Sequence, residues 1–178
     1  MKMVYFVRHG ESVWNVEDKI CGRTDSPLTE KGHMQAVETG KTILASGIKA
    51  DEILYSPLER AKDTAMHISE ITGIPVREEP RLIEQHFGKW EGTSPRKAEA
   101  FQAAKRQFAT DYEGGESMLR LAQRIYNLLD EIKEDEKTYI LVAHNGIARV
   151  VKSYFCDMTN EEYGGFGVDN CSVTRFDF

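Results

Sequence analysis

The sequence predicts an α/β protein with a mostly parallel sheet covered by helices on both faces. Short apolar runs from Met3 to Val7 and from Tyr139 to Ala143 are typical of strands buried on both faces. A weaker strand candidate runs from Glu52 to Ser56, and the proline that follows it favours the start of a helix. Apolar strands that alternate with amphipathic helices favour this fold class.

The elements of the first half follow in order. After the strand at Met3 to Val7 we expect a helix from Thr29 to Ser46, closed by Gly47. Its expected inner face consists of Val37, Gly40, Ile43 and Leu44. After the strand at Glu52 to Ser56, Ser56 is the expected N-cap of a helix that stops at Gly73. The apolar positions of this helix are Leu58, Ala61, Ala65, Ile68 and Ile71.

The second half contains the clearest helical periodicity. Ser94 and Pro95 are expected to open a helix whose apolar residues are Ala98, Phe101, Ala104 and Phe108. A loop at Gly114 and Gly115 precedes the strongest periodic segment, "SMLRLAQRIYNLLDEI". The β-prone segment from Cys171 to Phe178 is expected at a sheet edge.

Composition limits the classes of protein. A length of 178 residues predicts a single domain, residues 1–178, and 40% hydrophobic with 29% charged residues is ordinary for a globular protein. The net charge of −6, without a long basic run, argues against a nucleic-acid partner. The apolar run near the N-terminus is too short for a signal peptide or a membrane span, so we expect a cytoplasmic protein with no membrane partner. Cys21, Cys156 and Cys171 lack metal-site spacing and are expected to be buried thiols.

Polar residues follow each expected strand. Arg8 and His9 follow the first strand, the segment from Ser56 to Arg60 follows the second, and the segment from His144 to Gly146 follows the third. Because ligands of parallel sheets bind beyond the carboxyl ends of the strands, we expect these residues at one site. The guanidinium groups of Arg8 and Arg60 match a tetrahedral oxyanion, so phosphate is the expected ligand.

The histidines suggest phosphoryl transfer. His9, placed beside two arginines, is expected to be neutral and therefore nucleophilic, so that it could form a phosphohistidine. Glu84 is a candidate proton donor for the leaving group, because burial beside a phosphate raises the pKa of a carboxyl. His144 would help to stabilise the transition state. A metal site through Asp25 or Glu84 remains an alternative, although no metal-binding motif is present.

The remaining histidines receive a different interpretation. His33, His67 and His86 are expected to be structural or solvated. His86 could nevertheless face the same cleft, because it lies close to Glu84 in the sequence.

Six blocks, in order, resemble the histidine phosphatase superfamily, also called the phosphoglycerate mutase-like family. They are "RHGESVWN", "CGRTDSPLTEKG", "SPLERAKDTA", "LIEQHFGKWEG", "GGES" and "LVAHNGIARVV". The resemblance implies a three-layer α/β/α sandwich with an antiparallel strand, and catalysis without a metal or other cofactor. It also implies the nucleophile His9, the proton donor Glu84 and the transition-state ligand His144. The implied phosphate ligands are Arg8, Asn15 and Arg60, and the implied substrate-lining residues are Cys21 and Gly22.

Two departures from the family pattern bear on the substrate. Asn145 stands where relatives often have glycine, and its amide could contact the phosphate or the leaving group. The segment from Thr93 to Glu113, which we expect to be a small cap, is shorter than the insertion of the family's phosphoglycerate mutases. Its basic residues, Lys105 among them, are expected on a solvated helix face, although they could meet an acidic substrate.

Several functions remain open at this point. The short cap favours a phosphatase of small phosphate esters, similar to alpha-ribazole or broad-specificity phosphatases. The alternatives are a bisphosphoglycerate-dependent phosphoglycerate mutase, a non-catalytic phospholigand sensor and a metal hydrolase. The sequence selects neither the physiological substrate nor an oligomeric state.

Overall fold

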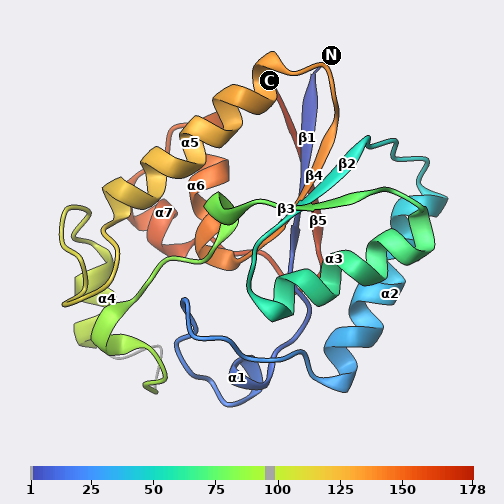
Figure 1. Cartoon of the computed structure of the whole chain (residues 1–178). Coiled ribbons are helices and arrows are strands. Elements are labelled where there is room, and N and C mark those ends of the chain that lie inside the picture. Colours follow the sequence, from blue (N-terminus) through green and yellow to red (C-terminus); the bar gives the residue numbers. More distant parts are fainter. Residues whose placement is uncertain (1, 95–98) are drawn as a thin grey trace.

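The computed structural model describes residues 2–94 and 99–178, and these residues form a five-stranded sheet (Figure 1). Its order is β3-β2-β4-β1-β5, and β5 alone pairs antiparallel. The strands are β1 (Met3–Arg8), β2 (Glu52–Tyr55), β3 (Val76–Glu78), β4 (Tyr139–Ala143) and β5 (Val173–Asp177). The predicted α/β class, mostly parallel with one antiparallel strand, is therefore confirmed.

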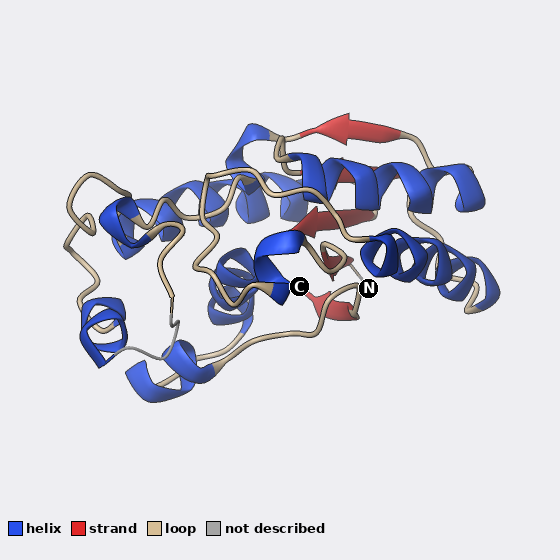
Figure 2. Ribbon diagram, turned by 90° about the horizontal axis from the view of Figure 1, so that it is seen from below, coloured by secondary structure: helices blue, strands red, loops and turns tan. Residues whose placement is uncertain are grey.

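Helices lie on both sides of the strands (Figure 2). They are α1 (Val13–Val16), α2 (Glu30–Ala45), α3 (Glu59–Thr72), α4 (Glu99–Lys105), α5 (Met118–Glu134), α6 (Asn145–Phe155) and α7 (Asn160–Gly165). Short 3-10 turns occur at Pro80–Leu82 and Gly88–Trp90. In the described part of the chain, no helix is both long enough and apolar enough to cross a bilayer.

The alternation of side chains along β1 separates two cores. Val4 and Phe6 pack with residues of α5 and α6, whereas Tyr5 and Val7 pack with residues of α2 and α3. Because successive side chains of a strand point to opposite faces, a strand covered on both faces must be apolar throughout. This explains the uninterrupted apolar run and fixes β1 rigidly inside the protein.

The helix α2 follows the prediction closely, with one error. It begins after Thr29, whose hydroxyl caps the N–H of Gly32, and Ile43 is buried as expected. Leu44 was expected on the inner face but is 59% exposed. It lies next to the buried stripe on the solvent side, since a position adjacent to Ile43 is turned about 100° around the helix axis.

The start of α3 also differs from the prediction. Its N-cap is Leu58, which makes no side-chain capping bond, so the prediction of Ser56 as N-cap was wrong. The Ser56 hydroxyl instead contacts His144. The predicted end of this helix is confirmed, because Gly73 adopts the left-handed conformation at φ 72°.

The second half of the fold was predicted in part. The α5 helix and the edge strand β5 are confirmed, but β3, α6 and α7 were not predicted. The expected helix start at Pro95 lies outside the described residues. The α4 helix ends at Lys105, before Phe108, and Phe108 packs against the core beneath α5 and α6.

Candidate active site

Three strands of the sheet end side by side and bring the candidate residues together. β1 and β4 are in register at Arg8 and Ala143, and the His9 N–H donates to the Ala143 carbonyl at 2.9 Å. The N–H of Ser56, after β2, donates to the carbonyl of Val142 at 3.0 Å. The two histidines that follow β1 and β4 therefore lie at one edge, with ring centroids 5.2 Å apart.

The imidazole of His9 is buried and held through one nitrogen. Its Nδ1 lies 2.7 Å from the carbonyl oxygen of Gly10, which can only accept, so Nδ1 carries the proton. A neutral ring then presents its lone pair at Nε2. Gly10 is required here, because a Cβ at this position would come within 2.5 Å of the carbonyl oxygen of Gly32. The side chain of Asn170 also holds this strand end by donating to the His9 carbonyl at 2.8 Å.

The second histidine is completely buried and bonded to a serine. His144 Nε2 lies 2.6 Å from the hydroxyl of Ser56, which accepts from the N–H of Leu58 at 3.4 Å. The serine proton is thus directed at Nε2, which leaves the His144 proton on Nδ1. Burial, together with the positive charge of Arg60, holds the pKa of His144 well below its usual value. His144 is therefore neutral, and its Nδ1 has no hydrogen-bond partner among the described residues.

The two predicted arginines are held differently. Arg8 lines the pocket, and its Nη1 donates to the carbonyl of Val168 at 2.6 Å. Arg60 is only 1% exposed, and its guanidinium donates to the carbonyls of Gly22 at 2.7 Å and Thr24 at 3.1 Å. Arg60 therefore lies behind the pocket wall, and Gly22 contributes by orienting it.

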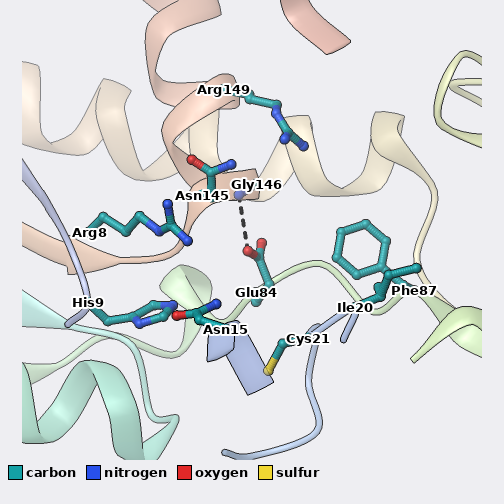
Figure 3. Close-up of a pocket in the computed structure, with 10 residues that line it drawn as sticks. All are labelled: Arg8, His9, Asn15, Ile20, Cys21, Glu84, Phe87, Asn145, Gly146 and Arg149. Atoms are coloured by element: carbon teal, nitrogen blue, oxygen red, sulfur yellow. Dashed lines mark hydrogen bonds between the residues drawn. The ribbon is translucent and has the colours of Figure 1, made fainter. Parts of the chain in front are cut away.

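Glu84 lies in the interior with both carboxyl oxygens bonded to main-chain N–H groups. Oε1 accepts from Gln85 at 2.8 Å and Oε2 accepts from Gly146 at 3.0 Å, as Figure 3 shows for the second bond. Burial raises the pKa of Glu84 although both bonds act to lower it. Gly146 allows this approach, because a Cβ there would come within 2.4 Å of Oε1.

These groups surround a pocket of about 100 Å³ (Figure 3). Its lining residues are Arg8, His9, Asn15, Ile20, Cys21, Glu84, Phe87, Asn145, Gly146 and Arg149. Six of these are predicted site residues, namely Arg8, His9, Asn15, Cys21, Glu84 and Asn145. The buried residues Arg60 and His144 are not on the wall, and neither is Gly22.

Two asparagines on the wall are oriented by the protein. The Oδ1 of Asn15 accepts from the N–H of Ser12 at 3.0 Å and from the Asn170 amide at 3.3 Å. The Oδ1 of Asn145 accepts from the N–H of Val168 at 2.9 Å. Since protein donors hold each amide oxygen, each amide nitrogen points the other way as a fixed donor.

The sequence reasoning missed Arg149 and the part that Ser56 plays. Arg149 lines the pocket from α6, and its Nε donates to the carbonyl of Phe166 at 2.7 Å. Its position four residues after Asn145 places both on one helix face, a signal that was available once α6 was recognised. Ser56 was identified as following a strand, but its bond to His144 joins residues 88 positions apart and has no local signature.

The other histidines lie apart from this pocket wall. His33 Nδ1 and His67 Nε2 are 2.9 Å apart, between α2 and α3. His86 Nδ1 accepts from the N–H of Gly88 at 2.9 Å, and its Nε2 lies 3.7 Å from Glu91. The possibility that His86 faces the cleft is therefore not realised, since it is not among the lining residues.

The donor set offers little for a metal ion. Within residues 2–94 and 99–178, no three His, Cys, Asp or Glu side chains group in a way that could hold one. Asp25 accepts from the N–H of Glu59 at 2.9 Å, while the Glu84 oxygens accept the main-chain bonds described above.

The site as a whole combines a candidate nucleophile, a candidate proton donor and donors for an anion. A histidine held through its Nδ1, a buried carboxyl whose pKa is raised and converging guanidinium and amide donors lie at the carboxyl edge of a mostly parallel sheet. This combination is typical of phosphoryl-transfer enzymes.

Comparison with known proteins identifies the family. The profile of the histidine phosphatase superfamily (branch 1) matches residues 4–178, and the chain belongs to this superfamily. The predicted resemblance is confirmed, and with it the prediction of an enzyme acting on phosphoric monoesters.

Individual relatives carry mutase and phosphatase names. The probable phosphoglycerate mutase GpmB of Erwinia tasmaniensis is 32% identical over 99% of this chain and 85% of its own length. The mycobacterial glucosyl-3-phosphoglycerate phosphatase bound to VO3 superposes with a TM-score of 0.86 at 29% identity, over 98% of this chain and 90% of that one. A putative alpha-ribazole-5'-P phosphatase from Escherichia coli superposes with a TM-score of 0.83 at 27% identity, over 99% and 91% of the two chains.

Proposed function

We propose that this enzyme is a metal-independent phosphatase that hydrolyses small phosphate monoesters through a phosphohistidine on His9. The observation that carries the proposal is the pairing of two groups in one pocket. The Nδ1 of His9 is bonded to the Gly10 carbonyl, which makes Nε2 the nucleophilic nitrogen, and Glu84 is a buried carboxyl whose pKa is raised. A nucleophile and a proton donor are the two groups that the first chemical step needs.

In the first step, His9 Nε2 attacks phosphorus and the bond from phosphorus to the ester oxygen breaks. The departing alkoxide takes the proton of Glu84, which becomes a carboxylate. In the second step, water attacks phosphorus, the P–N bond breaks and the Glu84 carboxylate accepts the proton of the water. His9 and protonated Glu84 are then restored, and inorganic phosphate leaves.

The surrounding donors stabilise the charge on the transferring group. Arg8 and Arg60 supply positive charge, and Asn15 and Asn145 supply amide donors. The Nδ1 proton of His144 is a further donor, held in place through Ser56. Such pre-oriented donors provide most of the rate enhancement in phosphoryl transfer, because general acid catalysis alone contributes about 10²–10⁴.

The alcohol part of the ester would lie beside Cys21, under the cap. We propose that residues 93–113 form this cap on one domain of residues 1–178, although residues 95–98 lie outside the described part of the chain. Phe101 and Tyr112 pack with Ile20 and Phe87, so the cap rests on two residues of the pocket wall. Gly22 would act through its bond to Arg60.

A phosphoglycerate mutase is the second candidate, favoured by the name of the curated relative from Erwinia tasmaniensis. Interconversion of 2- and 3-phosphoglycerate in the presence of bisphosphoglycerate would support it. Release of inorganic phosphate without that interconversion would exclude it.

The proposal is tested with p-nitrophenyl phosphate in excess chelator, for the wild type and His9→Ala together. We expect hydrolysis by the wild type and an acid-labile phosphoryl group that His9→Ala lacks. Inactivity throughout pH 5 to 8, about the range around the histidine pKa, would contradict a phosphatase. Ligand binding without a phosphoenzyme would indicate a sensor, and loss of activity in chelator would indicate a metal hydrolase.

A further inference from the structure

The "GGES" block lies against the segment that carries Glu84. The N–H of Glu116 donates to the carbonyl of His86 at 2.8 Å, and the side chain of Gln85 donates to the carbonyl of Glu116 at 3.1 Å. Gly115 permits this approach, because a Cβ there would come within 2.2 Å of the His86 carbonyl oxygen. The proposed chemistry does not use this block, although it is bonded to the neighbours of the proton donor.

The carboxylate of Glu116 is paired with two arginines. Its Oε1 accepts from Nε of Arg124 at 2.8 Å, and its Oε2 accepts from Nη2 of the same guanidinium at 2.9 Å. The Nη2 of Arg23 lies 3.3 Å from Oε2. Only 11% of the Glu116 side chain and 17% of the Arg124 side chain are exposed, so salt screens this bidentate pair weakly.

Both arginines also hold the main chain of the proton donor. The Nε of Arg23 donates to the carbonyl of Glu84 at 3.4 Å, and Nη2 of Arg124 donates to the same carbonyl at 3.5 Å. The Nη1 of Arg124 donates to the carbonyl of Arg81, a few residues earlier. In the described chain, residues 83–87 belong to no helix or strand, so their carbonyls depend on contacts of this kind.

The two ends of Glu84 are therefore held by different groups. Its carboxyl accepts the two main-chain N–H groups described above, and its carbonyl accepts from Arg23 and Arg124. We propose that Glu116 is a positioning residue for the proton donor, because it orients the two arginines that hold the Glu84 main chain and offsets their charge. This inference rests on the proposed function, in which Glu84 protonates the leaving group.

The charge of Glu116 has a consequence for the proton on Glu84. A nearby guanidinium without a counterion favours a carboxylate, whereas a nearby carboxylate favours a protonated carboxyl. Burial already raises the pKa of Glu84. Loss of the Glu116 charge should therefore lower this pKa, and loss of the Arg124 charge should raise it further. The other charged or titratable groups around Glu84 stay the same in both cases, and they are Arg8, His9, Arg60, Lys105, Arg149 and Tyr163.

The test compares Glu116→Gln with Arg124→Met. Each substitution breaks the bidentate pair, so loosened packing alone would change both variants in the same way. The quantity measured is kcat/KM for glycerol 2-phosphate divided by kcat/KM for p-nitrophenyl phosphate, whose phenolate leaves without protonation, from about pH 5 to pH 9.

Opposite changes are expected in the two variants. The ratio should begin to fall at a lower pH than in the wild type for Glu116→Gln, and at a higher pH for Arg124→Met. At the alkaline end, the ratio for Glu116→Gln should be about tenfold below that of the wild type, a part of the about 10²–10⁴ that general acid catalysis contributes. Arg23→Met, at a more exposed arginine, should change the ratio in the same direction as Arg124→Met and decides the test if Glu116→Gln does not fold.

Glu52→Gln is the matched control. Glu52 accepts from two nitrogens of Arg77 at 3.2 and 3.4 Å, and 16% of its side chain is exposed, but it lies outside the pocket wall. This variant should keep the wild-type ratio at every pH. Glu116→Asp retains the charge and should restore the pH dependence toward that of the wild type. Changes in the same direction for Glu116→Gln and Arg124→Met, or identical behaviour of Glu116→Gln and Glu52→Gln, would overturn the inference.

An infrared titration separates this inference from the proposed function. Difference spectra against Glu84→Gln isolate the C=O band of the protonated Glu84 carboxyl, with no substrate present. This band should disappear at a lower pH in Glu116→Gln than in the wild type, and at a higher pH in Arg124→Met. If these shifts occur while the wild type hydrolyses neither ester, the phosphatase proposal fails and the control of Glu84 by Glu116 stands. If both esters are hydrolysed but the band titrates alike in all three proteins, the inference alone is wrong.

Discussion

Replacing Glu84 by glutamine tests the proton donor most directly. The amide has nearly the same shape but cannot supply the proton that an alkoxide needs. For an alkyl ester such as glycerol 2-phosphate we expect kcat/KM to fall about 10²–10⁴-fold, or about 3 to 5 kcal/mol in the barrier. For p-nitrophenyl phosphate, whose phenolate leaves without protonation, the fall should be less than about tenfold on the same physical grounds.

The structure also predicts the effect of this substitution on stability. Glu84 accepts one N–H on each oxygen, from Gln85 and from Gly146. A glutamine can accept only one of them and turns its NH₂ toward the other, which leaves buried donors unpaired. The free energy of unfolding should therefore fall by about 1–3 kcal/mol, equivalent to a decrease in Tm of roughly 2–10 °C for a protein of this size.

The assay is a rapid-mixing measurement of p-nitrophenolate, followed by acid-sensitive detection of the phosphoenzyme. Because Glu84 also activates water in the second step, Glu84→Gln should release about one equivalent of p-nitrophenolate quickly and then stall as phosphohistidine. Glu79→Gln, a buried glutamate paired with Arg81 outside the pocket wall, controls for lost stability. Equal losses of kcat/KM for both esters, or a steady rate without a burst, would refute the assignment.

Three further predictions follow from neighbouring contacts. Gly146→Ala should lower kcat/KM for alkyl esters by at least about tenfold, because the added methyl displaces the Glu84 carboxyl. Gly164→Ala is the control and should leave kcat/KM unchanged, because its Cβ would have open space around it. Equal activity in the two variants would contradict this prediction. The lowered pKa of His144 means that the stability it contributes is present above its unfolded value near 6.5 and is lost as pH falls. Between pH 8 and 5, the Tm of the wild type should therefore decline more steeply than the Tm of His144→Asn. Parallel curves of Tm against pH for the two proteins would contradict a contribution from His144. Burial raises the pKa of the Cys171 thiol to about 11, so a thiol reagent at pH 8 should label Cys171 only after unfolding; labelling of all three thiols in the native protein would be inconsistent with that.

The edge position of the site could be predicted because it depends on local sequence. Apolar strands and the polar residues after them identified Arg8, His9 and His144, and the register of β1 with β4 brings them together as expected. Glu84 lies in an irregular segment without periodicity, so residue type and resemblance to the family suggested its role, but no pattern placed it at the sheet edge. Its packing against Gly146 depends on two segments 62 residues apart, which no local pattern encodes.

The errors have equally physical causes. Ser56 has the residue type of an N-cap, but tertiary contact with His144 uses its hydroxyl instead. Arg149 was missed because the segment after His144 was interpreted only by its resemblance to the family and not as a helix with two faces. Leu44 shows that an apolar residue beside a buried stripe can face water. The prediction of three buried thiols was right only for Cys171, because Cys156 is exposed at the end of α6 and Cys21 is partly exposed.

The contacts that hold the end of β1 come from the far end of the sequence. The Arg8 guanidinium donates to Val168, the Arg8 carbonyl accepts from Cys171, and Asn170 holds the His9 carbonyl. During synthesis the ribosome makes His9 161 residues before Asn170. The nascent chain therefore lacks these supports while the residues between them are translated, and the pocket is finished only after residues 168–171 have emerged.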